Sequence, residues 1–162
     1  MASNPARTTN LSLLRRLANA PGVSGFEEAA QAIAYEELAA HADEVWRDRM
    51  GNVIALKRAV TNGAAPPRRL MYAAHVDEIG MMVRHVDADG FIRFQAIGGL
   101  DPRTLVSERV VVHGTKNGKH ELKGVIAPQA GWLGTAQDRE RVFPMKELYI
   151  DLGRAAKDVH AL

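Results

Sequence analysis

Two stretches near the N-terminus carry apolar residues at helical spacing. The first covers residues 11–20 and ends at Pro21, because proline has no backbone N–H and its ring clashes with the preceding helical turn. The second runs from residue 26 to about residue 42. Ser24 lies three residues before Glu27, a spacing that predicts a capping box in which each side chain satisfies a backbone amide of the other residue. The chain is therefore expected to begin with two helices.

The next part of the chain changes to β-type patterns. Residues 45–47 and 53–56 are short β-rich runs around a reversal at residues 48–52, which predicts a hairpin. Arg69–His75 forms an apolar run without polar alternation, a pattern typical of a strand that is buried on both faces in the middle of an α/β sheet. Two helices, a hairpin and a buried strand together predict the opening of an α/β layer.

After Asp77 the pattern is entirely β. Apolar runs are separated in pairs by two turn sequences, Asp87–Gly90 and Lys116–Lys119, and Asn-Gly in the second favours a tight hairpin turn. Between the pairs, Ile97–Pro102 is a glycine-rich bend that opens a short helix. We expect this region, residues 78–146, to be a small all-β, barrel-like domain. The four apolar runs are residues 79–86, 91–96, 109–113 and 120–127.

The fold class expected from these elements is α/β, with the small all-β domain inserted into an α/β layer of which only part is present. Residues 1–77 would form the N-terminal part of the α/β layer and residues 78–146 the insertion. Residues 147–162 would contain a strand returning to the layer, at 148–152, and the start of a further helix. Because this layer has few strands and its last helix is short, we expect the chain to be the front part of a longer fold.

Composition and charge exclude several classes of site. The 162 residues include no cysteine, which excludes disulfides, thiolate metal sites and a cysteine nucleophile. The formal charge is +2, from 21 basic and 19 acidic residues that are dispersed, so nucleic-acid binding is not expected. No apolar run approaches the ~20 residues that span a membrane. Since the N-terminus also lacks the apolar core of a signal peptide, we expect a cytoplasmic protein without a membrane partner.

The strongest candidate for chemistry is the end of the apolar strand, Ala74–Glu78. Side chains alternate along a strand, so His75 and Asp77 are expected on the same side, and ligands of open α/β sheets bind beyond the carboxyl ends of the strands. A neutral imidazole is a good ligand for Zn²⁺ or Co²⁺, and a nearby carboxylate can orient it. The same spacing also fits a histidine bonded to a backbone carbonyl and an aspartate that caps the next turn.

Two other patterns carry a weaker indication of metal binding. Asp87–Gly90 begins like a calcium loop, but it lacks the later glutamate and lies between two strands, which favours a plain turn. His113 and His120 would share one face of a hairpin if the Asn-Gly turn sets the register, and such a pair is more typical of surface pairing than of a metal site.

Several stretches, taken together and in order, resemble the N-terminal portion of the M42 metallo-aminopeptidases, the family of glutamyl and deblocking aminopeptidases and of tetrahedral peptidases. Each stretch by itself is a modest signal, but the combination is specific. The four main stretches are Pro21–Glu27, Asp48–Asn52, Ala74–Gly80 and Ile97–Arg103, and the weaker ones are Leu122–Ile126 and Leu148–Gly153.

The resemblance implies a catalytic α/β domain with an inserted β domain that mediates dimerisation within larger assemblies. It also implies two divalent metal ions, zinc or cobalt, in the complete enzyme, and the removal of N-terminal residues from peptides by metal-activated water. The strand-end histidine of the family, a ligand of one metal ion, falls on His75. The aspartate two residues later, which helps to orient the site, falls on Asp77.

The sequence also departs from the family. The bridging aspartate, the glutamate pair that holds the general base, and the remaining ligands come after the segment that matches Tyr149–Gly153. One histidine and one orienting aspartate cannot align a metal-activated water with a peptide carbonyl. We therefore expect the N-terminal part of a metal-dependent aminopeptidase that is inactive as this chain alone. Its expected partners are peptide substrates, further copies of the chain that associate through the β domain, and a C-terminal half chain.

Two alternatives belong to other functional classes. A non-catalytic interaction protein derived from the family would retain the β domain, self-associate through it and bind no metal. A glycan-hydrolysing role, suggested by the cellulase label of some relatives, lacks a pair of carboxylates placed to protonate and attack a glycosidic bond.

Overall fold

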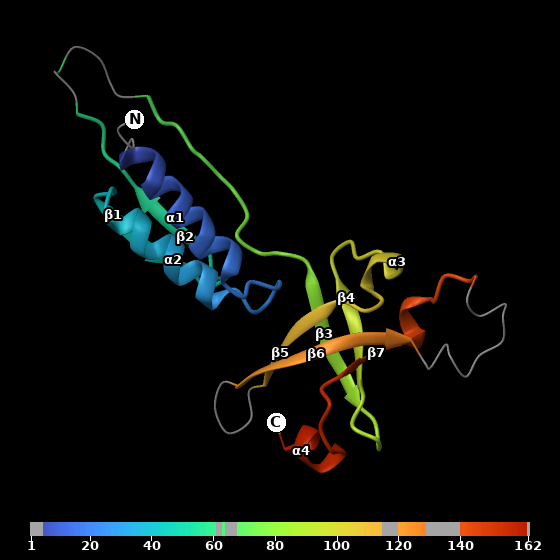
Figure 1. Ribbon diagram of the computed structural model, residues 1–162. Coiled ribbons are helices and arrows are strands. Elements are labelled where there is room, and N and C mark those ends of the chain that lie inside the picture. The colour runs from blue at the N-terminus through green and yellow to red at the C-terminus, as the bar shows by residue number, and fades with distance from the viewer. Residues whose placement is uncertain (1–4, 61–62, 64–67, 115–119, 129–139, 162) are drawn as a thin grey trace. The chain divides into compact units, whose positions relative to one another are not determined.

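The computed structural model describes residues 5–60, 63, 68–114, 120–128 and 140–161 (Figure 1). The chain divides into two compact units, a first unit of Met1–Glu78 and a second unit of Ile79–Leu162. No helix in the described part of the chain is both long enough and apolar enough to cross a membrane.

The first unit contains the two helices and the hairpin that the sequence predicts. Helix α1 (Pro5–Asn19) lies beside helix α2 (Glu28–Ala39), and the Arg16 guanidinium on α1 forms ion pairs with Glu36 and Glu37 on α2 at 2.5 and 2.6 Å (Figure 1). The hairpin joins β1 (Glu44–Arg47) to β2 (Val53–Leu56) in antiparallel register. Both strands lie against α2, so helix and hairpin form one small layered unit.

The loop of this hairpin explains the Asp48–Asn52 stretch. The Asp48 carboxylate accepts hydrogen bonds from the backbone N–H groups of Met50 and Asn52, both at 2.9 Å, and from the Asn52 side chain at 2.8 Å. Gly51 has φ +86°, and a Cβ atom there would lie 2.9 Å from Nε2 of Gln31 on α2. The positive φ is the reason for glycine here, because a residue with a Cβ atom is strained in this conformation.

The predicted capping box is wrong. Helix α2 begins at Glu28 with Glu27 at the N-cap position, and no side chain caps it. The Glu27 carboxylate accepts a hydrogen bond from the backbone N–H of Gly25 at 2.5 Å, whereas the Ser24 hydroxyl donates to Asp77. The reason is that Ser24 lies within a tight turn before α2, where its hydroxyl is bound to Asp77.

The predicted buried strand Arg69–His75 is also not formed. The segment is extended but has no strand partner in the described residues, and the side chains of Leu70, Met71 and Tyr72 are 76%, 86% and 89% exposed. A strand requires neighbours on which its N–H and C=O groups can form hydrogen bonds. The apolar pattern of the segment is that of a central strand, but the described residues provide no neighbouring strands with which it pairs.

The second unit is built on a five-stranded antiparallel sheet of order β3-β4-β7-β6-β5 (Figure 1). Within it, β3 and β4 form the predicted hairpin through Asp87, whose carboxylate accepts from the N–H groups of Asp89 and Phe91, so this is a turn as expected. The predicted turn Lys116–Lys119 lies outside the described residues. The strands are β3 (Gly80–Val86), β4 (Ile92–Ile97), β5 (Arg109–Gly114), β6 (His120–Pro128) and β7 (Leu148–Asp151).

Two expectations for this region need correction. Strand β7 does not return to the α/β part, because it pairs with β6 over Val125–Pro128 and with β4 at Ile92. Its side chains Leu148 and Ile150 are 1% and 3% exposed, so burial in the second unit holds the strand there. A closed barrel is not confirmed, since β3 and β5 are opposite edges of the sheet and no strand pair joins them in the described residues.

One face of the sheet carries the hydrophobic core of the second unit. Two short helices contribute to this core: α3 (Pro102–Leu105) supplies Leu105, and α4 (Ala156–His160) supplies Val159. A 3-10 helix, η2 (Met145–Glu147), leads directly into β7. The other buried core residues are Ile92, Phe94, Ile126, Leu148 and Ile150.

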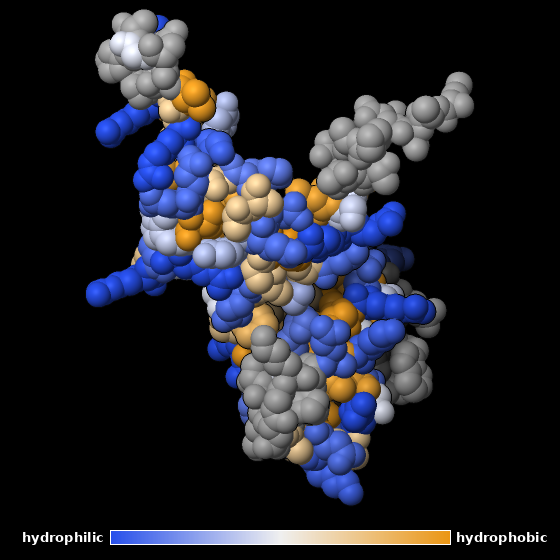
Figure 2. All heavy atoms as spheres, turned by 90° about the vertical axis from the view of Figure 1, so that its left-hand side faces the viewer, coloured by the Kyte–Doolittle hydropathy of each residue, from blue (hydrophilic) through white to orange (hydrophobic). Residues whose placement is uncertain are grey.

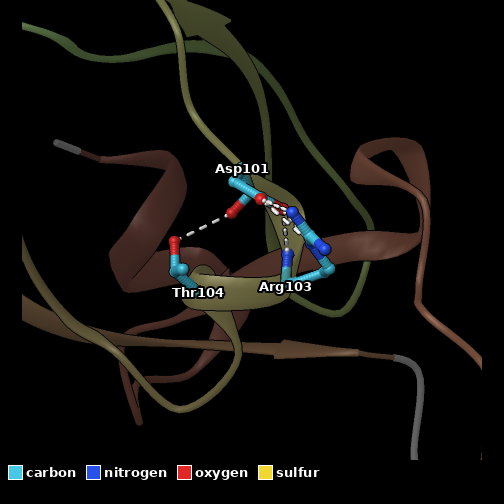
Figure 3. A network of polar contacts seen from close by, with 3 residues as sticks. All are labelled: Asp101, Arg103 and Thr104. Carbon is cyan, nitrogen blue, oxygen red and sulfur yellow. Dashed lines mark hydrogen bonds and ion pairs between the residues drawn. The ribbon is translucent and has the colours of Figure 1, made fainter.

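The glycine-rich bend opens helix α3, as the sequence predicts, and Asp101 is its N-cap (Figure 3). The Asp101 carboxylate accepts from the backbone N–H of Arg103 at 2.9 Å and from its guanidinium at 2.5 to 3.0 Å, while the Thr104 hydroxyl donates to the Asp101 carbonyl. The side-chain and then the backbone hydrogen bonds of Arg103 lower the pKa of Asp101 to about 2. This stretch of the family resemblance therefore has a local structural role.

We predict that the Asp101 carboxyl group titrates with a midpoint near pH 2 in carbonyl-detected NMR. Because this folded-state pKa lies below the ordinary value of 3.8, ionised Asp101 stabilises the fold above about pH 4, and the contribution is lost as the pH falls from about 4 to about 2. Arg103→Gln should raise the midpoint, whereas Lys123→Gln on β6 should leave it unchanged. A wild-type midpoint near the ordinary value would contradict the assignment.

Candidate functional site

His75 and Asp77 lie together at the end of the exposed segment and are hydrogen bonded to each other. His75 Nδ1 is 3.0 Å from Asp77 Oδ1 and 2.9 Å from the Asp77 backbone oxygen. His75 Nδ1 therefore has two acceptors, one from the Asp77 carboxylate and one from the Asp77 backbone. Since both neighbouring atoms are acceptors, the hydrogen-bond network assigns the hydrogen to Nδ1 and leaves the lone pair on Nε2. The His75 side chain is 86% exposed, so Nε2 is accessible to a ligand.

Ser24 is a third member of the site that sequence reasoning assigned to a different role. Its hydroxyl donates a hydrogen bond of 2.6 Å to Asp77 Oδ2. The two carboxylate oxygens of Asp77 are therefore divided between Ser24 and His75. These contacts lower the pKa of Asp77, and the Ser24 hydrogen bond has the largest effect. Partial desolvation raises this pKa, and the His75 hydrogen bond lowers it further. At neutral pH the carboxylate is ionised and only accepts hydrogen bonds.

A tight turn presents Ser24 to Asp77. The backbone N–H of Phe26 donates to the Val23 carbonyl at 2.7 Å, which makes Ser24 and Gly25 the central residues of a four-residue turn. Gly25 has φ +86°, the left-handed value that a type II turn requires at its third position. The Ser-Gly pair within Pro21–Glu27 was the sequence signal for this turn, although the nearby glutamate favoured the capping interpretation.

A parallel bridge holds the turn beside the histidine segment. Val23 and Glu78 form the bridge, and the Glu78 N–H donates to the Gly22 carbonyl at 2.8 Å. Ser24 follows Val23 and Asp77 precedes Glu78, so both residues adjoin the bridge, and their side chains form a hydrogen bond beside it. The site thus depends on contacts between segments that are more than 50 residues apart in the sequence.

The described residues do not form a metal centre by themselves. No group of three or more His, Cys, Asp or Glu side chains that could hold a metal ion occurs among them. His75 and Asp77 supply two potential ligating groups, and a tight zinc site needs three or four. The other candidate pair also fails, because strand pairing places His113 opposite Glu121 and not opposite His120.

Comparison with known proteins identifies the relatives of this chain. The sequence model of the M42 glutamyl aminopeptidase family matches residues 51–162. The lysyl aminopeptidase of Pyrococcus furiosus is 33% identical over 147 residues, which cover 90% of this chain and 40% of that protein. An aminopeptidase from Desulfurococcus kamchatkensis is similar in structure, with a TM-score of 0.79, 32% identity, and coverage of 94% of this chain and 39% of that one.

A third relative is the TET1 peptidase of Pyrococcus horikoshii, with a TM-score of 0.71, 30% identity, and coverage of 92% of this chain and 42% of that one. That protein assembles into a tetrahedron or a large octahedral shell. This chain therefore spans about two fifths of the length of the relatives it matches.

We predict that Gly25→Ala weakens the turn that carries Ser24. A Cβ atom at Gly25 meets nothing within 4 Å, so the effect is purely that of forcing an L residue to φ +86°, which costs about 1–2 kcal/mol. Amide hydrogen exchange at Phe26, whose N–H closes the turn, should become about tenfold faster.

Gly22→Ala is the matched control, because Gly22 has no positive φ and an added Cβ would lie at ordinary contact distance, 3.5 Å, from Ala30 and Val76. Equal exchange rates at Phe26 in the Gly25→Ala variant and the wild type would contradict this account of the turn.

Proposed function

Because the chain belongs to the M42 peptidase family, we propose that it forms the N-terminal part of a metal-dependent aminopeptidase, to which it contributes the imidazole of His75 as a ligand and the carboxylate of Asp77 as its orienting group. The observation that supports this role is the hydrogen bonding of His75. Asp77 occupies the Nδ1 side of the ring, and Nε2, the nitrogen with the lone pair, is exposed. A carboxylate on the far nitrogen of a ligating histidine fixes the tautomer and raises ligand basicity.

The residues present do not hold a metal ion alone, as the missing third ligand in the described part of the chain indicates. The proposal is therefore that the other ligands of two divalent ions, zinc or cobalt, and the general base come from the part of the enzyme that the relatives contain and this chain does not span. Peptides with a free N-terminus are the proposed substrates.

The exposed apolar segment supports the need for such a partner. Leu70, Met71 and Tyr72 follow one another, each more than three quarters exposed, on an extended chain without strand neighbours in the described residues. Figure 2 shows apolar surface interspersed with hydrophilic surface on one face of the molecule. We propose that strands of the remaining catalytic domain cover this segment in the complete enzyme, and that the chain alone associates through it.

The second unit is the proposed element of homo-oligomerisation. Its position in the sequence matches the β domain that the family resemblance implies, and the TET1 peptidase of Pyrococcus horikoshii forms closed shells. Because β7 and the core residue Val159 belong to this unit, the proposed oligomerisation element extends beyond the expected boundary at residue 146.

We predict that the isolated chain forms dimers or larger species at roughly tens of micromolar, since exposed apolar surface and unpaired strand edges associate in the micromolar to millimolar range. Met71→Lys should shift sedimentation-velocity profiles towards smaller species, because a charge in the exposed apolar segment opposes association through this segment. Met50→Lys is the control, since Met50 is 85% exposed, compared with 86% for Met71, but lies in the β1–β2 loop. A monomeric wild type, or equal effects of the two variants, would contradict the proposal.

The enzymatic role can be tested with a chimera of this chain and the remaining three fifths of the Pyrococcus furiosus lysyl aminopeptidase. We expect the isolated chain to leave aminoacyl p-nitroanilides intact with Zn²⁺ or Co²⁺, and the folded chimera to hydrolyse them until a chelator is added. His75→Ala should lower kcat/KM by about a hundredfold or more, and Asp77→Asn by about 10- to 100-fold.

His41→Ala, which alters an exposed histidine outside the site, is the matched control. A folded chimera that is inactive, or whose activity is unaffected by His75→Ala, would contradict the proposal and favour a non-catalytic interaction protein.

A further inference from the structure

We propose that Ser24 is a positioning residue for His75: its hydroxyl holds the Asp77 carboxylate in the orientation that keeps the imidazole in the Nδ1–H form. The use of the resulting Nε2 lone pair rests on the proposed function, but the positioning itself depends only on the contacts among Ser24, Asp77 and His75.

Each oxygen of the Asp77 carboxylate has its own partner. Oδ2 accepts the hydrogen bond of the Ser24 hydroxyl at 2.6 Å, and Oδ1 faces His75 Nδ1 at 3.0 Å. A carboxylate with a single partner can rotate about its Cβ–Cγ bond, because this terminal torsion is broad. With Oδ2 fixed by Ser24, the rotation that would remove Oδ1 from the imidazole breaks a second hydrogen bond.

The site is also exposed to solvent. The side chains of His75 and Asp77 are 86% and 40% exposed, so water competes for every polar atom and an isolated contact between them is weak. Free histidine in water favours the Nε2–H form. The Nδ1–H form of His75 therefore needs acceptors that remain in place. The Asp77 backbone oxygen at 2.9 Å is one of them, and the Ser24 hydrogen bond keeps the Asp77 carboxylate in place as the other.

Backbone hydrogen bonds fix the position of Ser24. Ser24 has a single side-chain torsion before its hydroxyl, and it lies in a turn closed by the Phe26 N–H. The Glu78 N–H holds this turn beside Asp77 through the Gly22 carbonyl. A donor on such a short side chain loses little conformational freedom when it binds the carboxylate.

The test is the tautomer of His75, measured by ¹³C and ¹⁵N NMR of histidine-labelled full chain at a pH at which the imidazole is neutral, with His75→Gln to assign the signal. The wild type should be mainly in the Nδ1–H form. Ser24→Ala should lower the ratio of the Nδ1–H form to the Nε2–H form roughly threefold to tenfold, the range expected for the net loss of one ordinary intramolecular hydrogen bond, because this one is exposed to water. Ser24→Thr, which retains a hydroxyl, should restore the ratio.

Ser12→Ala is the matched control, because Ser12 is exposed on α1 in the same unit. A wild-type His75 mainly in the Nε2–H form would overturn the proposal whatever the variants do, so the test does not depend on the folding of Ser24→Ala. An unchanged ratio in a Ser24→Ala variant whose Phe26 amide retains its protection would overturn it as well.

The chimera separates this inference from the proposed function. If Ser24→Ala changes the tautomer ratio and lowers kcat with little change in KM, both stand. If the ratio changes while activity does not, positioning by Ser24 stands and the proposed use of His75 in catalysis falls. If activity falls while the tautomer ratio is unchanged, Ser24 acts in another way and the positioning role is rejected.

Discussion

The hydrogen bonds between residues 22–24 and 77–78 are the constraint on which the candidate site depends. The Glu78 N–H on the Gly22 carbonyl and the Ser24 hydroxyl on Asp77 connect the turn before α2 to the end of the apolar segment. Without them, His75 and Asp77 would lie on an extended chain with no fixed surroundings. The turn that carries Ser24 is therefore as much a part of the site as the histidine.

The second unit is stabilised in a different way, because the burial of apolar side chains holds the strands of its sheet together. Ile126 is fully buried, with Leu148 and Ile150 almost so, and these residues bring β6 and β7 together although more than a dozen residues separate the two strands. Gly124 makes this possible, since a Cβ atom there would lie 2.6 Å from the Ile150 side chain. The unit is thus a sheet with its own core, which is the property of an independent domain.

The family relationship gives these two units a common context. The chain spans about two fifths of the length of its relatives, and the segment that reads as a central strand has no strand neighbours among the described residues. An apolar strand of this kind is stable only when both faces and both edges are covered. In the described residues, an incomplete set of metal-ligating groups and an uncovered apolar segment accompany this partial coverage.

The sequence by itself determined the features that depend on neighbours within a few residues. The two helices, the Asp48 and Asp87 turns, the Asp101 cap and the proximity of His75 to Asp77 all follow from local spacing. The tertiary structure decided which partners distant residues take. Ser24 binds a carboxylate 53 residues away, not the amides of the nearby helix, and β7 joins β4 and β6 through the burial of Leu148 and Ile150. Local patterns carry no information on such pairings, because one hydroxyl or one apolar strand can be satisfied equally well by several partners, and only the folded chain selects among them.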